Sequence, residues 1–197
     1  MKAQKTLLSV SVASALLALS LGAAAQTVRI ANQGDALSLD PHSLNESLQL
    51  SVDSNAYEAL VGWNKKLEMV PMLATSWKQM SPTVWRFELR KGVQFHDGTP
   101  FTADDVVFTM GRIAADGSDM KAYSNDVKET RKIDSHTVEI ETKTPLPILP
   151  QILSQVYVMS KKWCEENNAV RPVDRRKGVE NTASFKTNGT GPFHVRE

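Results

Sequence analysis

The sequence predicts a mixed α/β domain with many short strands and few long helices, and two adjoining segments carry that prediction. Residues 84–90 (VWRFELR) alternate apolar and charged side chains, which is the period-two pattern of a half-buried strand. Residues 102–114 carry an apolar stripe at helical spacing, behind Thr102 as a candidate N-cap. Asp105 follows three residues later, where a capping box places an acidic or amide side chain. The turn-forming sequence HDGTP at 96–100 separates the two segments, so we expect a strand, a turn and a capped helix.

The N-terminal segment is typical of a secretory signal peptide. Lys2 and Lys5 precede the apolar run 6–22, and the small residues 23–25 offer a cleavage site before Gln26. The run is shorter than the roughly 20 residues that a membrane-spanning helix needs, and serines interrupt it. No cysteine lies near the cleavage site, so a lipid anchor is not expected. We therefore expect export to the periplasm, with cleavage near Ala25–Gln26 and release from the membrane.

Composition and charge restrict the class of protein. The 197 residues are 41% hydrophobic and 23% charged, which is ordinary for a soluble globular protein. Cleavage after Ala25 would remove two lysines and no acidic residue, so the formal net charge would fall from +1 to −1. A nearly neutral chain argues against a nucleic-acid partner, since such partners usually leave a basic footprint. The single cysteine, Cys164, cannot form an internal disulfide, and we expect it to be a structural thiol.

The first half of the chain predicts these elements in order. Apolar residues recur every four positions after a capping-box pair, Ser43 and Glu46, which indicates a helix over 46–60. A short strand is expected over 27–32, before a loop at 33–42. An extended piece is expected to begin at 61–63, and residues 67–71 then lead to a short segment at 72–77.

The second half alternates short elements with turns. A strand pair is expected at 127–131 and 137–142, with His136 at the turn between them. The prolines at 145, 147 and 150 punctuate the next stretch. The remaining expectations are a loop or short helix at 115–125, a short helix at 148–153, a strand-like run at 156–159, a helix beginning at 160–166, an irregular segment at 171–186, a turn at 188–192 and the start of a strand at 193–195.

His96 and Asp97 are the candidates for reactive chemistry. Beside Asp104 and Asp105 they have the residue types of a metal site or of an acid/base pair in a secreted hydrolase. No second histidine or cysteine has ligand spacing here, and the hydrolase needs a third converging group that the sequence does not offer. The alternative is structural: Asp97 bonds its own turn, and the later acids cap the helix.

Five sequence motifs occur in an order that resembles a known family. They are LSLDPH at 37–42, YEALV at 57–61, PMLATSW at 71–77, the segment 85–112, and GTGPF at 189–193. Together they resemble the solute-binding family 5 receptors of peptide-type ABC importers. The resemblance implies a periplasmic receptor with two lobes and a hinge, which closes around a solute and delivers it to permease subunits in the inner membrane.

The resemblance also implies a division of the chain. Family members are more than twice as long, and their second lobe follows the GTGPF motif. We therefore expect a first lobe with an inserted subdomain, and the second lobe missing. The expected division is the signal peptide at 1–25, the start of the first lobe at 26–60, the inserted subdomain at 61–180, and the return to the first lobe at 181–197.

The resemblance places candidate ligand-binding residues in the loop after the first strand and in the GTGPF turn, although both segments would also serve as plain turns. We expect no catalytic residue, no metal and no cofactor. The expected solute is a di- or oligopeptide, with glutathione, haem, a nickel chelate or an oligosaccharide as alternatives, and the full-length receptor is expected to be a monomer. A non-functional truncated product and the secreted hydrolase remain the other functional hypotheses. The candidate ligand-binding residues are Gln33, Gly34, Asp35, Ala36, Leu37, Ser38, Asn188, Gly189 and Thr190.

Overall fold

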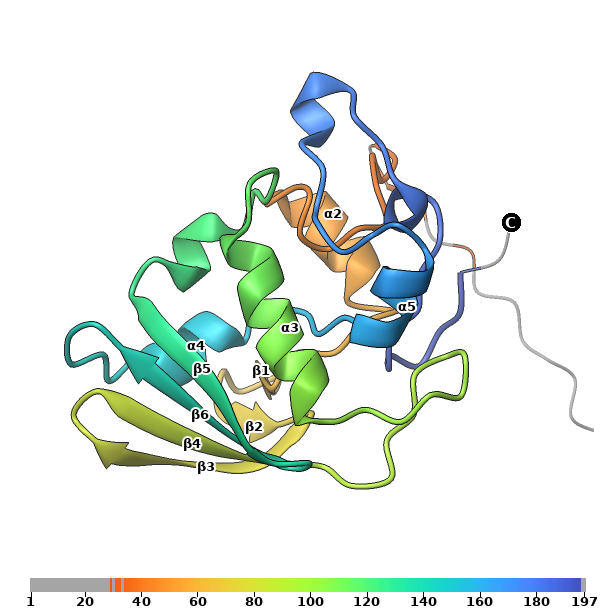
Figure 1. Ribbon diagram of the computed structural model, residues 1–197. Coiled ribbons are helices and arrows are strands. Elements are labelled where there is room, and N and C mark those ends of the chain that lie inside the picture. Colours follow the sequence, from red (N-terminus) through yellow and green to blue (C-terminus); the bar gives the residue numbers. More distant parts are fainter. Residues whose placement is uncertain (1–28, 30, 33, 196–197) are drawn as a thin grey trace, which may run out of the picture. The chain divides into compact units, whose positions relative to one another are not determined.

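The computed structural model describes residues 29, 31–32 and 34–195. The predicted signal peptide, Gln33 and half of the predicted strand at 27–32 lie outside the described residues. The chain divides after Gln33 into two units, and the second, Gly34–Glu197, contains every helix and strand discussed below (Figure 1).

A four-stranded antiparallel sheet is the main β structure of this unit. Its strand order is β3-β4-β6-β5. The predicted strand at 84–90 is β4, and its alternation is confirmed because Phe87 and Leu89 are buried while Glu88 is exposed. The predicted pair at 127–131 and 137–142 is also confirmed, with the first strand extending further than expected. The strands are β3 (Ala74–Ser81), β4 (Val84–Leu89), β5 (Val127–Asp134) and β6 (Thr137–Thr142).

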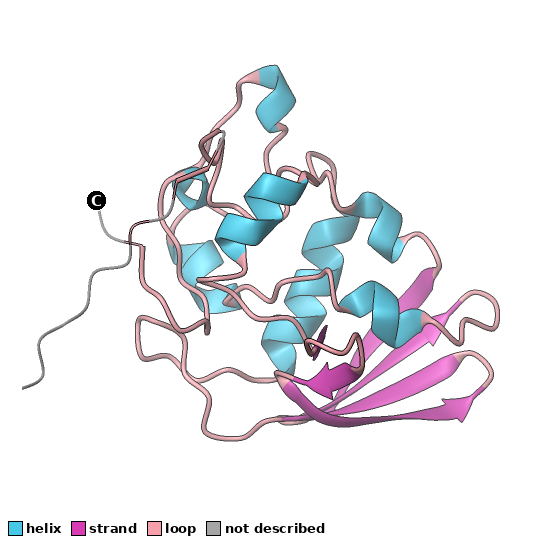
Figure 2. Ribbon diagram, turned by 180° about the vertical axis from the view of Figure 1, so that it is seen from behind, coloured by secondary structure: helices cyan, strands magenta, loops and turns pink. Residues whose placement is uncertain are grey.

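Helix α3 (Ala103–Ala114) packs on one face of this sheet, against β5 and β6 (Figures 1 and 2). Its predicted capping box is present: the Asp105 carboxylate accepts the Thr102 backbone N–H at 2.8 Å, and the Thr102 side chain accepts backbone N–H groups of the first turn. Phe101 and Val106, on either side of the cap, are both buried. The apolar stripe of the helix and the inner face of the sheet share one hydrophobic core.

The opposite face of the sheet carries charged side chains. Arg86 lies across from Glu139 and Glu139 across from Arg131 in the strand register. Glu139 accepts from Arg86 at 2.7 Å and from Arg131 at 3.1 Å. This face is therefore balanced in charge rather than strongly acidic or basic.

The predicted helix at 46–60 is shorter than expected, and this part of the prediction is wrong. Helix α2 runs only over Ser47–Asp53, and Glu46 caps it by accepting the N–H groups of its first turn. The Asn55 side chain donates to two carbonyls of the last turn, which ends the helix. Beyond it the chain turns inward, and Ala59 pairs with Tyr157 as an isolated bridge. The apolar residues of the pattern beyond Asp53 are still buried, but the chain there is irregular and not helical.

Short elements complete the unit. A hairpin of β1 (Val61–Trp63) and β2 (Met69–Pro71) precedes the sheet. The predicted short helices are confirmed as α4 (Leu149–Leu153) and α5 (Lys161–Glu166). Single 3-10 turns occupy Lys121–Ser124, Arg175–Lys177 and Thr182–Ser184.

Two further strand predictions are wrong. The run at 156–159 contributes only the bridge at Tyr157, because its neighbour in the core is the irregular chain around Ala59 and not a full strand. Residues 193–195 form no regular structure, and Phe193 is instead tied through its N–H to the Asn55 carbonyl.

Candidate functional site

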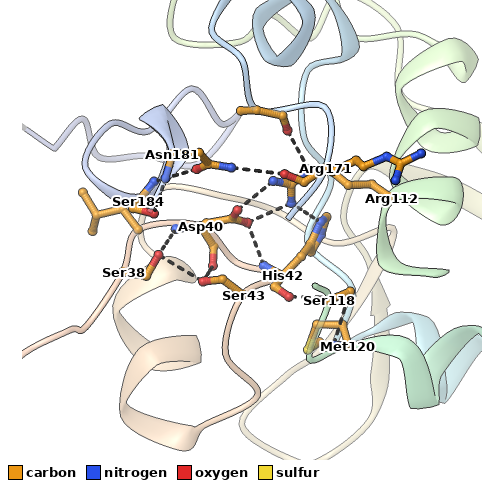
Figure 3. A network of polar contacts seen from close by, with 12 residues as sticks. Ser38, Asp40, His42, Ser43, Arg112, Ser118, Met120, Arg171, Asn181 and Ser184 are labelled. Atoms are coloured by element: carbon orange, nitrogen blue, oxygen red, sulfur yellow. Dashed lines mark hydrogen bonds and ion pairs between the residues drawn. The ribbon is translucent and has the colours of Figure 1, made fainter. Parts of the chain in front are cut away.

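A buried ion pair lies beneath the loop that the sequence assigns to the ligand. Arg112 of α3 donates two parallel hydrogen bonds to the Asp40 carboxylate, at 2.8 and 2.7 Å, and both side chains have no exposed surface (Figure 3). The Arg112 Nε donates to the Ala169 carbonyl at 3.0 Å. Burial works to raise the pKa of Asp40, but the adjacent guanidinium outweighs it and holds that pKa below its ordinary value. Such two-point pairing fixes geometry as well as charge.

His42 extends this network in a single tautomer. Its Nδ1 lies 2.8 Å from an Arg112 nitrogen, which can only donate, so Nδ1 accepts. Its Nε2 therefore carries the proton and donates to the Tyr157 carbonyl at 2.9 Å. Burial and the positive charge of Arg112 lower the pKa of His42 to about 3, so the ring is neutral at physiological pH.

The backbone of Ser38 and Leu39 forms hydrogen bonds with side chains and with one distant carbonyl, and not with a neighbouring strand. Gln49 of α2 accepts the Ser38 N–H at 3.1 Å and donates to the Ser38 carbonyl. The Leu39 N–H donates to the Ser184 carbonyl at 3.0 Å, and the Tyr57 hydroxyl donates to the Leu39 carbonyl at 3.3 Å. Because buried backbone groups need partners, these contacts allow an irregular segment to lie inside the protein.

The predicted ligand-binding loop is thus divided into an exposed tip and a buried base. Gly34, Asp35 and Leu37 are exposed, with Leu37 67% accessible, and Ala36 is half-buried. Ser38 is only 2% exposed. Gln33 lies outside the described residues. The ligand role of these residues stays a prediction.

The other predicted site residues lie in a turn that is bonded to the HDGTP turn. Asn188 and Asp97 are joined twice: the Asp97 N–H donates to the Asn188 amide oxygen at 3.0 Å, and the Asn188 amide donates to the Asp97 carboxylate at 2.9 Å. The His96 N–H donates to the Gly189 carbonyl at 2.9 Å. Gly189 and Thr190 have no hydrogen bond to the loop 34–38 in the described part of the chain, and their ligand role also stays a prediction.

These contacts favour the structural interpretation of His96 and Asp97. The Asp97 carboxylate accepts from the Thr99 N–H at 2.9 Å, which confirms the turn predicted for it. The His96 Nε2 donates to the Gly191 carbonyl at 2.8 Å, and its ring stacks on His194 at 3.9 Å between centroids. The two side chains are therefore directed to different partners. Among the described residues, no cluster of three His, Cys, Asp or Glu side chains could hold a metal ion.

Cys164 has no exposed surface and lies in a hydrophobic cluster separate from the core under the sheet, with Ala56, Tyr57, Met159, Ala169 and Ala183. Burial raises the pKa of its thiol to about 12, so the reactive thiolate is scarce. This environment supports the predicted structural thiol.

One surface hollow in the described part of the chain lies away from the predicted loop. It measures about 660 Å³ and is lined from the ends of the sheet strands, including Glu88, Lys91 and His136. It is wide open to solvent and contains no residue of the predicted loop.

Sequence reasoning missed the residues that hold the loop in place, chiefly Gln49, Asp53 and Arg112. The helical pattern contained no signal for Arg112. This residue lies about 200° around the helix from Met110, on the face opposite the apolar stripe, where an exposed charge is expected.

Comparison with known proteins identifies the family of the chain. The sequence model described as "Bacterial extracellular solute-binding proteins, family 5 Middle" matches residues 68–197, more than half of the chain. The chain belongs to this family. The resemblance carried by the five sequence motifs is thereby confirmed.

A curated relative and two solved structures illustrate the similarity. The glutathione-binding protein GsiB of Escherichia coli (strain K12) is 30% identical over 151 residues, which are 75% of this chain and 29% of that protein. The oligopeptide-binding protein AppA from Bacillus subtilis, solved with a nonapeptide, matches with a TM-score of 0.72 and 22% identity over 84% of this chain and 33% of AppA. NikZ from Campylobacter jejuni, solved with Ni(L-His), matches with a TM-score of 0.71 and 22% identity over 83% of this chain and 31% of NikZ.

These matches confirm the predicted fold class. At such identities the structures show the fold alone, which is the mixed α/β architecture of part of a family 5 binding protein. The chain spans about a third of the length of the proteins it matches, or 29% of GsiB. GsiB and AppA are both named as binding proteins. Among the described helices, none has both the length and the apolar character needed to cross a bilayer.

Proposed function

We propose that this chain belongs to the receptor of an ABC importer, which captures a peptide-like solute in the periplasm and delivers it to permease subunits in the inner membrane. Family membership over residues 68–197 is the observation that carries the proposal. The role is binding and delivery, without catalysis. The buried, neutral His42 and the contact of the His96 Nε2 with the Gly191 carbonyl are in keeping with it, because both rings bond to backbone carbonyls of the protein itself.

The similarity to GsiB supports a peptide-like solute. That protein is named for glutathione binding, and AppA was solved with a nonapeptide. Both ligands present amide groups and terminal carboxylates, which a receptor can hold by backbone hydrogen bonds without reading each side chain. The Ni(L-His) complex of NikZ makes a metal chelate the main competing class.

We propose that the solute contacts the loop 33–38 and is bordered by Asn188, Gly189 and Thr190. An exposed tip on a rigid base suits such a contact, because groups that are already ordered lose little entropy when ligand binds. The tip residues Gly34 and Asp35 are small or polar and leave the backbone accessible.

The proposed architecture assigns 26–60 and 181–197 to the first lobe and 61–180 to its inserted subdomain. The segment 1–25 would be the signal peptide. Solute would be enclosed when this lobe meets a second one, and the differential affinity of the solute for the closed state would favour closure. The complete receptor would act as a monomer, as expected for a protein that presents one solute to one permease.

Isothermal titration calorimetry on the full-length protein encoded by the gene tests the proposal. The panel is glutathione, a dipeptide, an octapeptide, Ni(L-His) and a disaccharide. We expect binding heat with at least one of the first three ligands, and heat confined to the chelate or the sugar would contradict the peptide assignment. Leu37→Asp should weaken binding, whereas Leu67→Asp, at another exposed leucine in the turn between β1 and β2, should leave it unchanged.

A further inference from the structure

The Gln49 side chain takes the place that a neighbouring strand would take beside Ser38. Its carboxamide pairs with both backbone groups of that residue, accepting the N–H at 3.1 Å and donating to the carbonyl. In a sheet, a flanking backbone makes the same two bonds. Gln49 is 1% exposed and comes from the middle of α2, a separate element of the fold.

We propose that Gln49 is a positioning residue, which holds the base of the loop 34–38 and thereby presents its exposed tip to solute. This inference rests on the proposed function of the loop. The tip belongs to no helix or strand, so the position of its C-terminal end depends on Ser38. Ser38 in turn is held through its backbone by Gln49 and through its hydroxyl by Ser43, at 3.0 Å.

The orientation of the carboxamide is fixed by Asp53. The Gln49 amide nitrogen has two hydrogens, of which one faces the Ser38 carbonyl and the other the Asp53 carboxyl at 2.8 Å. Both of these partners accept. A flipped amide would set its oxygen against both acceptors and its nitrogen against the Ser38 N–H, so only one orientation satisfies all the groups. Asp53 is 1% exposed, which makes the unsatisfied arrangement costly.

Gln49→Met removes the hydrogen bonds and keeps the approximate length of the side chain. Amide hydrogen exchange of the unliganded protein should show the Ser38 N–H exchanging at least about tenfold faster, since a buried hydrogen bond is worth roughly that factor. Affinity for the solute that binds the wild type should fall by about tenfold, because the loop must then be ordered on binding. Gln151→Met, at an exposed glutamine of α4, is the matched control and should change neither measurement.

Gln49→Glu supplies a conditional rescue that a merely structural role would not produce. When protonated, the glutamic acid accepts the Ser38 N–H and donates its O–H to the Ser38 carbonyl, so affinity at pH 5 should approach the wild-type value. When ionised, it faces that carbonyl and the carboxyl of Asp53, with Asp40 also nearby and Tyr57 and Tyr157 close to Asp53. Affinity at pH 8 should therefore fall by at least about tenfold relative to pH 5, and wild type should show no such drop.

The outcomes separate this inference from the proposed function. If the Ser38 N–H of Gln49→Met exchanges at the wild-type rate, the positioning role is wrong. Equal affinity of Gln49→Glu for the solute at both pH values would also overturn it. If the wild type binds no member of the panel, the proposed function fails, and the exchange measurement still decides whether Gln49 holds the loop. If Gln49→Met does not fold, the exchange rate of the Ser38 N–H in Gln49→Glu decides, after correction for the intrinsic effect of pH. Faster exchange at pH 8 than at pH 5 supports the positioning role, and equal exchange refutes it.

Discussion

Replacing Arg112 by methionine should remove the charge that compensates Asp40 while largely preserving the volume of the side chain. Both members of the pair have no exposed surface. The substitution would leave a buried carboxylate without its partner, and it would also leave the His42 Nδ1 and the Ala169 carbonyl without their donor.

We expect a loss of about 4 kcal/mol in the free energy of unfolding at pH 8, because breaking a buried ion pair typically costs about 3–5 kcal/mol. This is a large part of the roughly 5–15 kcal/mol that stabilises an ordinary domain. For a protein of this size the melting temperature should fall by roughly 8–16 °C. The loss should shrink at pH 5, because burial raises the pKa of an unpaired Asp40 above the unfolded value of 3.8, and the protonated carboxyl costs less to bury.

Urea unfolding followed by tryptophan fluorescence at pH 5 and pH 8 measures both effects. Arg86→Met removes a cation from the partly exposed pair with Glu139, and as the control it should change the midpoint much less. The double variant Asp40→Leu/Arg112→Met should be more stable than Arg112→Met alone, since no buried charge then lacks a partner. A free energy of unfolding for Arg112→Met within about 1 kcal/mol of the wild-type value at pH 8 would contradict this prediction, because breaking a buried pair should cost much more.

Three further predictions follow from buried groups. Burial raises the pKa of Asp53 from 3.8 to about 7, so the folded state keeps a proton that the unfolded chain loses, and stability falls as pH rises between these values. Asp53→Asn should therefore be more stable than the wild type at pH 8, by up to about 4 kcal/mol, with the advantage disappearing near pH 4; a constant difference in urea midpoint would contradict this. Cys164 should resist a thiol-specific disulfide reagent at pH 8 until urea unfolds the protein, and rapid labelling of the native state would show that the thiol is not buried as described. Gly189→Ala would place its new methyl group against the Ala56 carbonyl and should cost more than about 2 kcal/mol, whereas Gly111→Ala in α3 meets nothing and should gain about 0.5–1 kcal/mol in thermal unfolding.

Local patterns predicted the elements whose partners are close in sequence. The capping box at Thr102 and Asp105 and the alternation in β4 depend on neighbouring residues, so both could be predicted. The end of α2 could not be predicted, because the four-residue spacing of apolar residues continues to Ala56 and Leu60 as it would in a longer helix. The contacts that end it come from the Asn55 side chain and from Tyr157, about a hundred residues away in sequence.

The candidate site was predictable only in outline. The motif LSLDPH marks the loop, whose tip is exposed, while the ligand role of the loop stays a prediction. The base of the loop depends on Gln49 and Arg112, whose side chains reach it from two different helices. Gln49 belongs to none of the five motifs, and although Arg112 ends the segment 85–112, a single sequence contains no signal that pairs Gln49 with Ser38 or Arg112 with Asp40. Side-chain bonds to irregular backbone have no periodicity, so pattern analysis does not detect them.

The network around Asp40 has a consequence for the time at which the protein can fold. Asp40 is held by Arg112, 72 residues later, His42 bonds to Tyr157, 115 residues later, and the Leu39 N–H bonds to Ser184. Because the chain is synthesised from its N-terminus, these bonds cannot all form until the segment around Ser184 has been made. We therefore expect a high contact order and slow folding, with the loop among the last regions to become ordered. Under the proposed export, such a delay would keep the chain unfolded while it is threaded through a membrane channel.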